Sequence, residues 1–234
     1  MALPRAPRRI CLAVMALYTA WAHLDRELTL LSAHVRNFAA AKPSLDSASH
    51  FSLLDECLLE GLLSHVWQAW NGFCRECIID SCVGTVDANG VTIPGLAPAA
   101  SEAHVSSAAI RAKKQSAPPY WGQVNTVLRS EPTWGDVDVL TKIITRLRPV
   151  NGSKMLPAFS SAHANAKALQ VIRNGAAHTN VQTLGEINAM RSSFLVFPML
   201  HPTHAMFWIE PGSSDFLITH AIDELISAGL NAIS

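Results

Sequence analysis

The chain has 234 residues, of which 49% are hydrophobic and 15% charged, so it can bury a sizeable core and is not a disordered protein. Its 18 basic and 18 acidic side chains cancel, which excludes a uniformly basic or acidic surface. Five cysteines in this length exclude a disulfide scaffold and are typical of reduced thiols in a cytosol.

The charge is unevenly distributed along the chain. Residues 101–173 carry ten basic and four acidic side chains, a net +6, whereas the segments on either side are net negative. A basic segment permits contact with phosphate. Taken alone, however, it is better explained as a solvated face.

The N-terminus resembles a signal peptide. Residues 1–9 contain three arginines, and the nearly apolar segment 10–22 is too short to span a bilayer. The helical pattern nevertheless continues through Leu24, Leu28 and Phe38. We therefore predict one helix over residues 8–40 in a cytoplasmic protein, and keep secretion as the alternative.

The next segment predicts a long amphipathic helix followed by a loop-rich excursion. Apolar residues at helical spacing over 51–80 form one stripe, which the sequence places at Leu54, Leu58, Leu62, Val66, Trp70, Phe73 and Cys77. Asn89-Gly90 lies between β-branched residues and predicts a small hairpin. A short helix is expected over 101–114, inside a loop-rich insertion spanning 81–119.

The rest of the chain is predicted to be mostly helical. Proline and glycine positions bound helices that we place at 121–130, 136–148, 158–180 and 183–194, the last capped by Thr183. A single strand is expected around 206–209, and a last helix, capped by Ser213 or Ser214, ends at Ile233. The fold class is therefore all-α with a minor β element. We predict a single domain over 1–234, with residues 196–234 as a C-terminal extension.

One segment carries a pattern that suggests chemistry: Arg-Asn-Gly-Ala-Ala-His at residues 173–178. On a regular helix Arg173 lies about 40° from Leu169, inside the apolar arc. An arginine at such a place is costly unless it is paired or lies at an edge. Asn174 and His178 are four residues apart and share the opposite side of the helix.

These six residues match the Arg-Asn-Xaa-Xaa-Xaa-His signature of HEPN domains, and the chain resembles that family. Many HEPN domains are endoribonucleases that act as toxins or antiviral effectors. The resemblance covers roughly residues 10–195 in architecture, a bundle of helices with the motif late in the bundle, but only six residues in sequence.

The resemblance implies a HEPN-like bundle that cleaves RNA without a metal or other cofactor. His178 would accept the proton of the RNA 2′-hydroxyl, and Arg173 would stabilise the charge that develops on phosphorus. Asn174 would orient the phosphate or the imidazole, and Glu60 is a secondary candidate for orienting Arg173 or His178. The products would be a 2′,3′-cyclic phosphate and a 5′-hydroxyl. The implied partners are an RNA substrate and an antitoxin or sensor protein, with no membrane involved.

The spacing of the motif raises a geometric problem. Arg173 and His178 lie about 140° apart on a straight helix and cannot easily reach one phosphate. Either Gly175 loosens the helix, or two subunits form a shared cleft across a two-fold axis. The family resemblance favours the second explanation, a homodimer.

A structural interpretation of the same residues remains open. Arg173 would then pair with a carboxylate such as Glu56 or Glu60, and His178 would be a polar residue near a helix end. Under that interpretation the chain is a non-catalytic helical bundle that binds a partner protein. A third possibility is an RNA binder that does not cleave.

Three weaker patterns have ordinary structural explanations. Cys74 and Cys77 form a CxxC pair, but they lie on the apolar stripe of a helix and are expected to pack in the core. His201 and His204 lack an obvious third ligand nearby in the sequence, so a metal site is not expected. Trp121 lies in the basic segment, where base stacking is conceivable but nothing else in the sequence points to it.

Overall fold

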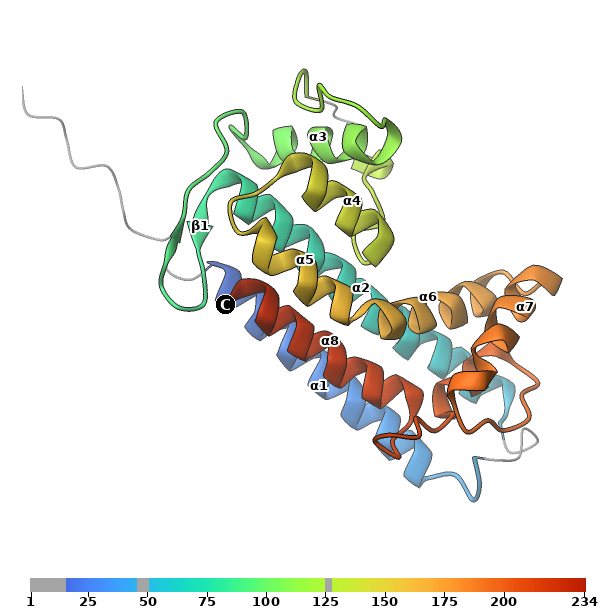
Figure 1. Ribbon diagram of the computed structural model, residues 1–234. Helices are drawn as coiled ribbons and strands as arrows, with labels where there is room; N and C mark the ends of the chain where they lie inside the picture. Colours follow the sequence, from blue (N-terminus) through green and yellow to red (C-terminus); the bar gives the residue numbers. More distant parts are fainter. Residues whose placement is uncertain (1–15, 46–50, 125–127) are drawn as a thin grey trace, which may run out of the picture.

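The computed structural model describes residues 16–45, 51–124 and 128–234. Within these ranges the chain forms helices and one small hairpin (Figure 1), so the predicted all-α fold class with a β-hairpin is confirmed. The α-helices are α1 (Ala16–Ala40), α2 (Leu53–Val83), α3 (Glu102–Lys114), α4 (Val137–Leu147), α5 (Gly152–Ser161), α6 (His163–Ala177), α7 (Val181–Ala189) and α8 (Leu217–Ile233). No helix in these ranges is both long and apolar enough to cross a membrane.

The core lies between four helices, α1, α2, α5 and α8, which run side by side through the molecule (Figure 1). α8 packs against both α1 and α5, and Gly229 allows the close approach, since a Cβ there would lie 3.2 Å from Leu24 and Trp21. Trp70 and Phe159 meet edge to face, with ring centroids 5.8 Å apart. Burying each such side chain contributes about 1.5–3 kcal/mol, so this layer dominates the stability of the fold.

α2 begins at a strong local signal. The Ser52 side chain accepts a hydrogen bond from Asp55 N at 3.3 Å, and the Asp55 carboxylate accepts one from Ser52 N at 2.7 Å. This reciprocal pair satisfies amides that have no partner within the helix. Lys42 joins the end of the α1 segment to the same carboxylate at 2.5 Å. Part of the predicted first helix, residues 8–15, lies outside the described residues.

The apolar stripe of α2 differs from the predicted one in its N-terminal half. Leu54 and Leu58 are 80% and 51% exposed, whereas Leu59 and Leu63 are fully buried. Leucines surround the helix here, so the sequence offers two alternative stripes, and packing against the rest of the bundle selects the second. The C-terminal half, from Val66 onward, is buried as predicted.

The hairpin and α3 follow α2 where the sequence predicts them. Strands β1 (Thr85–Val86) and β2 (Thr92–Ile93) are antiparallel, with Thr85 opposite Ile93. Within the turn, the Asp87 side chain accepts hydrogen bonds from Asn89 N and Val91 N, both at 2.9 Å. An Asx-type turn of this kind fixes the loop without long strands.

Two predicted helices are wrong. In the described part of the segment 121–130, residues 121–124 and 128–130, the structure has only a short 3-10 helix, η2 (Leu128–Ser130), and Arg111 holds the carbonyls of Tyr120 and Gln123 in a loop. The single helix expected over 158–180 is divided at Ala162 into α5 and α6. α5 packs along α8, whereas α6 changes direction and packs against η4, α7 and α2 as well as α8, so tertiary contacts override the helical propensity of the alanines.

The C-terminal part also corrects three local predictions. α7 is capped by Asn180, with Thr183 as its capping-box partner rather than the cap, and it is followed by η3 (Met190–Ser193). The strand expected at 206–209 is absent, since a 3-10 helix, η4 (Pro202–Phe207), occupies its first half and Ile209 forms only isolated bridges to Leu195 and Phe216. Neither Ser213 nor Ser214 caps α8, which begins at Leu217. Pro202 starts η4, where a missing N–H costs nothing.

Candidate functional site

Arg173 lies in the last turns of α6 and faces α2. Its guanidinium is half-buried, and Nη1 donates a hydrogen bond to Asn174 Oδ1 at 3.3 Å. Together with Glu60 and Ser64 it lines a cavity of about 140 Å³ between α2 and α6. The arginine inside the apolar arc is therefore accommodated at the edge of a small open cavity.

The expected carboxylate partner of Arg173 is not found. Among the described residues, no ion pair joins Arg173 to an acidic side chain, and Glu56 and Glu60 pair with histidines instead. Glu60 nevertheless shares the cavity with Arg173. The structure thus brings this secondary candidate close to the motif and leaves the guanidinium available to an anion.

Gly175 serves packing rather than flexibility. A Cβ at this position would lie 2.6 Å from Ile187 Cδ1 and 3.4 Å from Pro202 Cβ, so only glycine lets α7 and η4 lie this close to α6. The helix continues without interruption to Ala177. The suggestion that Gly175 loosens the helix is therefore wrong, and the motif has one rigid backbone up to its last residue.

His178 is the first residue beyond α6. Its N–H donates to Asn174 O at 2.9 Å, and its carbonyl accepts hydrogen bonds from Asn180 Nδ2 and Thr183 Oγ1. The imidazole is exposed, and no hydrogen bond of its ring is found in the described part of the chain. The cap of α7 thus fixes the backbone of His178 while the ring stays open to solvent.

Arg173 and His178 do not converge within one molecule. His178 is not among the residues that line the cavity beside Arg173, and it follows the helix on which Arg173 lies. A phosphate that contacts both side chains would require a change in the ring's position or a contribution from a second chain. Because α6 is regular through Gly175, a loosened helix does not bring the two side chains together.

His201, which caps η4, and His204 within η4 face two glutamates of α2, an arrangement that the sequence analysis missed. His201 Nε2 lies 3.3 Å from Glu60 Oε1, and His204 Nε2 lies 3.4 Å from Glu56 Oε1. The spacing His-Pro-Thr-His and the i, i+4 spacing of the glutamates were visible in the sequence. That the two pairs face each other follows only from how η4 packs on α2.

The backbone fixes the protonation of both rings. His204 Nδ1 accepts from the amides of Leu200 and His201 at 3.3 and 3.4 Å, and His201 Nδ1 accepts from Thr203 N at 3.4 Å. A ring nitrogen that accepts leaves its proton on Nε2, which in both rings points at a carboxylate. Nε2 of each histidine thus lies close to a carboxylate of α2, but the buried Nε2 of His204 makes no hydrogen bond within the described residues.

His204 is the more constrained of the two. Its ring is buried and stacks on Phe51, with centroids 4.2 Å apart. Burial lowers the pKa of His204, and the opposing effect of Glu56 does not compensate. The His204 ring is therefore uncharged at neutral pH. In acid, protonation of this buried ring is unfavourable and strains its contact with Glu56.

The remaining patterns are structural. Cys74 and Cys77 are fully buried, as expected, and burial raises the pKa of the Cys77 thiol. A protonated thiol in the core is not a nucleophile or a metal ligand. Within the described ranges, no three histidine, cysteine or acidic side chains are placed to hold a metal ion.

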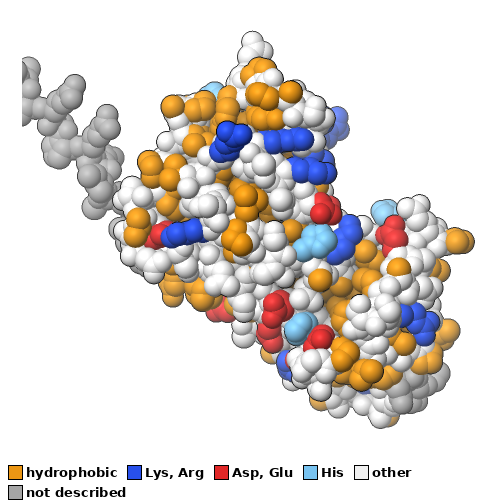
Figure 2. All heavy atoms as spheres, in the orientation of Figure 1, with side chains coloured by type: hydrophobic (Ala, Val, Ile, Leu, Met, Phe, Trp, Pro, Cys, Tyr) orange, Lys and Arg blue, Asp and Glu red, His pale blue; other side chains and the backbone are white. Residues whose placement is uncertain are grey.

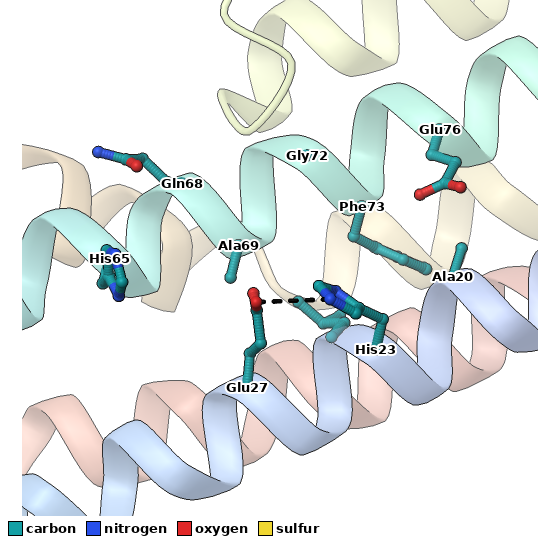
Figure 3. A pocket seen from close by; sticks show the side chains of 10 residues that line it. Ala20, His23, Glu27, His65, Gln68, Ala69, Gly72, Phe73 and Glu76 are labelled. Carbon is teal, nitrogen blue, oxygen red and sulfur yellow. Dashed lines mark ion pairs between the residues drawn. The ribbon is translucent and has the colours of Figure 1, made fainter.

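A second hollow, of about 340 Å³, lies between α1 and α2 (Figure 3). Its floor is formed by small residues such as Ala20 and Ala69, and its rim carries His23 and Glu27, which lie 3.5 Å apart. None of the candidate site residues, Arg173, Asn174, His178 and Glu60, lines it. The small side chains, which cannot fill the space between the helices, account for this hollow.

Comparison with known proteins finds no family, curated protein or solved structure that matches this chain.

Proposed function

We propose that this protein is a metal-independent endoribonuclease that acts as a homodimer. The observation that carries the proposal is the state of the motif on α6. Arg173 lines an open cavity without a carboxylate partner, Asn174 touches it, and the His178 ring is exposed one turn further on. A free guanidinium and a free imidazole on one short segment suit the chemistry of RNA cleavage.

The chemistry assigns one task to each side chain. RNA supplies the nucleophile, its own 2′-hydroxyl, and neutral His178 accepts the proton as the oxygen attacks phosphorus. Arg173 binds the phosphate oxygens, on which negative charge increases in the transition state. Asn174 Oδ1 accepts a hydrogen bond from Arg173 and so orients the guanidinium. The products are a 2′,3′-cyclic phosphate and a 5′-hydroxyl.

A second chain is needed to complete this site. Exposed apolar side chains lie on or beside three elements that contact α6: Leu54 at the start of α2, Val181 at the start of α7 and Leu200 just before η4 are each at least 80% exposed. All three elements pack against one another or against α6. Apolar side chains exposed around one end of a molecule indicate an interface. A two-fold contact here would bring His178 of one subunit towards Arg173 of the other.

The same surface favours a second candidate function. An apolar surface beside the motif would also bind a different protein, and the chain would then be a non-catalytic helical bundle. For a toxin or antiviral effector the two functions combine, because an antitoxin or sensor that covers this end would block the motif. Cleavage by the purified chain separates the two.

The test uses purified protein, free of partners, incubated with total RNA in excess EDTA. We expect the wild type to cleave and both Arg173→Ala and His178→Ala to lose cleavage while keeping their circular dichroism spectra. His163→Ala, which changes an exposed histidine at the other end of α6, is the matched control and should cleave normally. Cleavage that survives in both motif variants, or that needs a divalent metal, would contradict the proposal.

Mixing the two inactive variants tests the shared site. If each site combines Arg173 of one subunit with His178 of the other, a mixed dimer keeps one intact site. Random exchange of subunits then restores about a quarter of the wild-type activity. No recovery, with subunit exchange shown independently, would mean that the site lies within one chain.

A further inference from the structure

A second region of the molecule combines aromatic and basic side chains in a groove. It measures about 540 Å³ and lies between the loop after α3 and the C-terminal end of α4. Pro118, Tyr120 and Trp121 form the apolar side, and Arg146 and Arg148 form the basic side. In Figure 2, Lys and Arg side chains lie beside hydrophobic ones over this part of the molecule. The motif on α6 takes no part in it.

The loop that forms the apolar side is held in place by side chains. Arg111 Nη1 donates to Tyr120 O at 3.0 Å, and Gln115 Nε2 donates to Pro119 O at 2.8 Å. The Tyr120 hydroxyl donates to Ser116 O at 3.1 Å. Hydrogen bonds from side chains to the backbone fix the loop, so Trp121 has a defined place.

The two arginines of the basic side have different roles. Arg146 donates to Gln115 O at 2.6 Å and to Ala112 O, so its guanidinium holds the end of α3. Arg148 is exposed, and no hydrogen bond or ion pair of its side chain is found in the described residues. It follows α4 in the left-handed conformation, with φ 55°, which places it at the end of the helix. Arg148 is therefore the cation available to a ligand.

Three of the four acidic side chains of this basic segment pair with groups outside the groove, and the fourth, Asp136, caps the start of α4. Glu102 and Glu131 both pair with Arg75, and Asp138 pairs with His163. Lys113 and Lys114 are exposed at the end of α3, and no ion pair of theirs is found in the part of the chain that the structure describes. Part of the net charge of +6 carried by residues 101–173 therefore lies beside the groove, on positive side chains.

We propose that this groove binds single-stranded RNA, with a base against Trp121 and a phosphate beside Arg148. Aromatic side chains stack on bases of any sequence, and guanidinium groups bind phosphate oxygens through two hydrogen bonds. An acidic peptide would use the cations but gain little from the aromatic side. The groove itself does not distinguish RNA from DNA, so the choice of RNA rests on the proposed function. The binding step requires neither Arg173 nor His178.

The test measures binding separately from cleavage. Full-length protein carrying both Arg173→Ala and His178→Ala is the parent, and fluorescence anisotropy reports its Kd for a labelled 12-mer of uridine. In that background Trp121→Ala should weaken binding by about fivefold or more, and Trp121→Phe should retain most of it. Arg148→Gln should weaken binding and lower the slope of log K against log salt by about one.

The control is Lys142→Gln, which removes an exposed cation from the middle of α4, outside the groove. Lys142→Gln should keep both the salt slope and the Kd within twofold of the parent's values. If charge acted nonspecifically, this variant would weaken binding as Arg148→Gln does. The proposal is overturned if the parent does not bind the 12-mer, or if Arg148→Gln and Lys142→Gln behave alike. Displacement of the RNA by polyglutamate at equal charge concentration would instead identify an acidic-peptide site. Arg148 is exposed, so its substitution should not unfold the protein. The Arg148→Gln result therefore decides for or against the groove even if Trp121→Ala unfolds.

Discussion

Asp80 is a carboxylate whose ionisation opposes folding. Burial raises its pKa from 3.8 to about 6, and the negative charges of Glu76 and Glu102 add to the shift. It also lies in the last turn of α2, where the helix dipole disfavours a negative charge. Since the folded state favours the protonated form, this contribution to stability is complete below about pH 4 and is lost as the pH rises through 6.

The size of the effect follows from the pKa difference. A shift of about two units corresponds to about 3 kcal/mol between the protonated and charged forms. Asp80 is only partly buried, and solvent screens part of this, so we expect about 1–2 kcal/mol. The uncharged, equally sized variant Asp80→Asn should raise the free energy of unfolding by that amount at about pH 7.5 and by much less near pH 4.

Urea unfolding at a series of pH values measures this difference directly. Glu186→Gln is the control, because it neutralises an exposed carboxylate and should change stability by less than about 0.5 kcal/mol. If Asp80→Asn is no more stable than the wild type at pH 7.5, or if its gain does not depend on pH, the electrostatic account of α2 is wrong.

Three further variants test other contacts, each by urea unfolding. Ser52→Ala removes the cap of α2 and should lower the free energy of unfolding by about 1 kcal/mol, whereas an unchanged value would mean that the cap is not formed in solution. Burial raises the pKa of Glu131, but hydrogen bonds from Arg75 and two other side chains outweigh it and lower the pKa to about 2. The stabilisation by ionised Glu131 is therefore present above about pH 4.5 and lost in acid. Glu131→Gln should lower the free energy of unfolding by about 1–3 kcal/mol at neutral pH, and a loss that persists unchanged at pH 2 contradicts this. Because burial lowers the pKa of His204, the wild type should lose stability below about pH 6.5, and His204→Phe should flatten that dependence; an equally steep fall in the variant would exclude His204 as its cause.

Local signals predicted much of the helical framework. The hairpin and α3 follow from turn and cap residues that act over a few positions, and the C-terminal half of α2 follows from its apolar period. The division between α5 and α6 has no such signal, because an alanine-rich segment suits a helix on either side of Ala162. Long-range packing determines where the chain bends: both helices contact α8, but only α6 also packs against η4, α7 and α2 to a comparable extent.

The candidate site was likewise predictable only where local helical geometry determines it. The position of Arg173 at the edge of the apolar arc followed from helical geometry, and the structure places it beside Glu60 in one cavity. The packing role of Gly175 was not predictable, because Ile187 and Pro202 approach it from later segments of the chain. The pairing of His201 and His204 with the glutamates of α2 likewise depends on long-range packing.

The central claim is that the exposed imidazole of His178 acts as a base for RNA cleavage without a metal. The most direct measurement compares the 3′ ends of RNA incubated in excess EDTA with the wild type and with His178→Ala. We predict 2′,3′-cyclic phosphate ends from the wild type and none above background from the variant. Intact RNA with both proteins, together with equal growth of cells that express either one, would contradict the claim and leave a partner-binding bundle as the function.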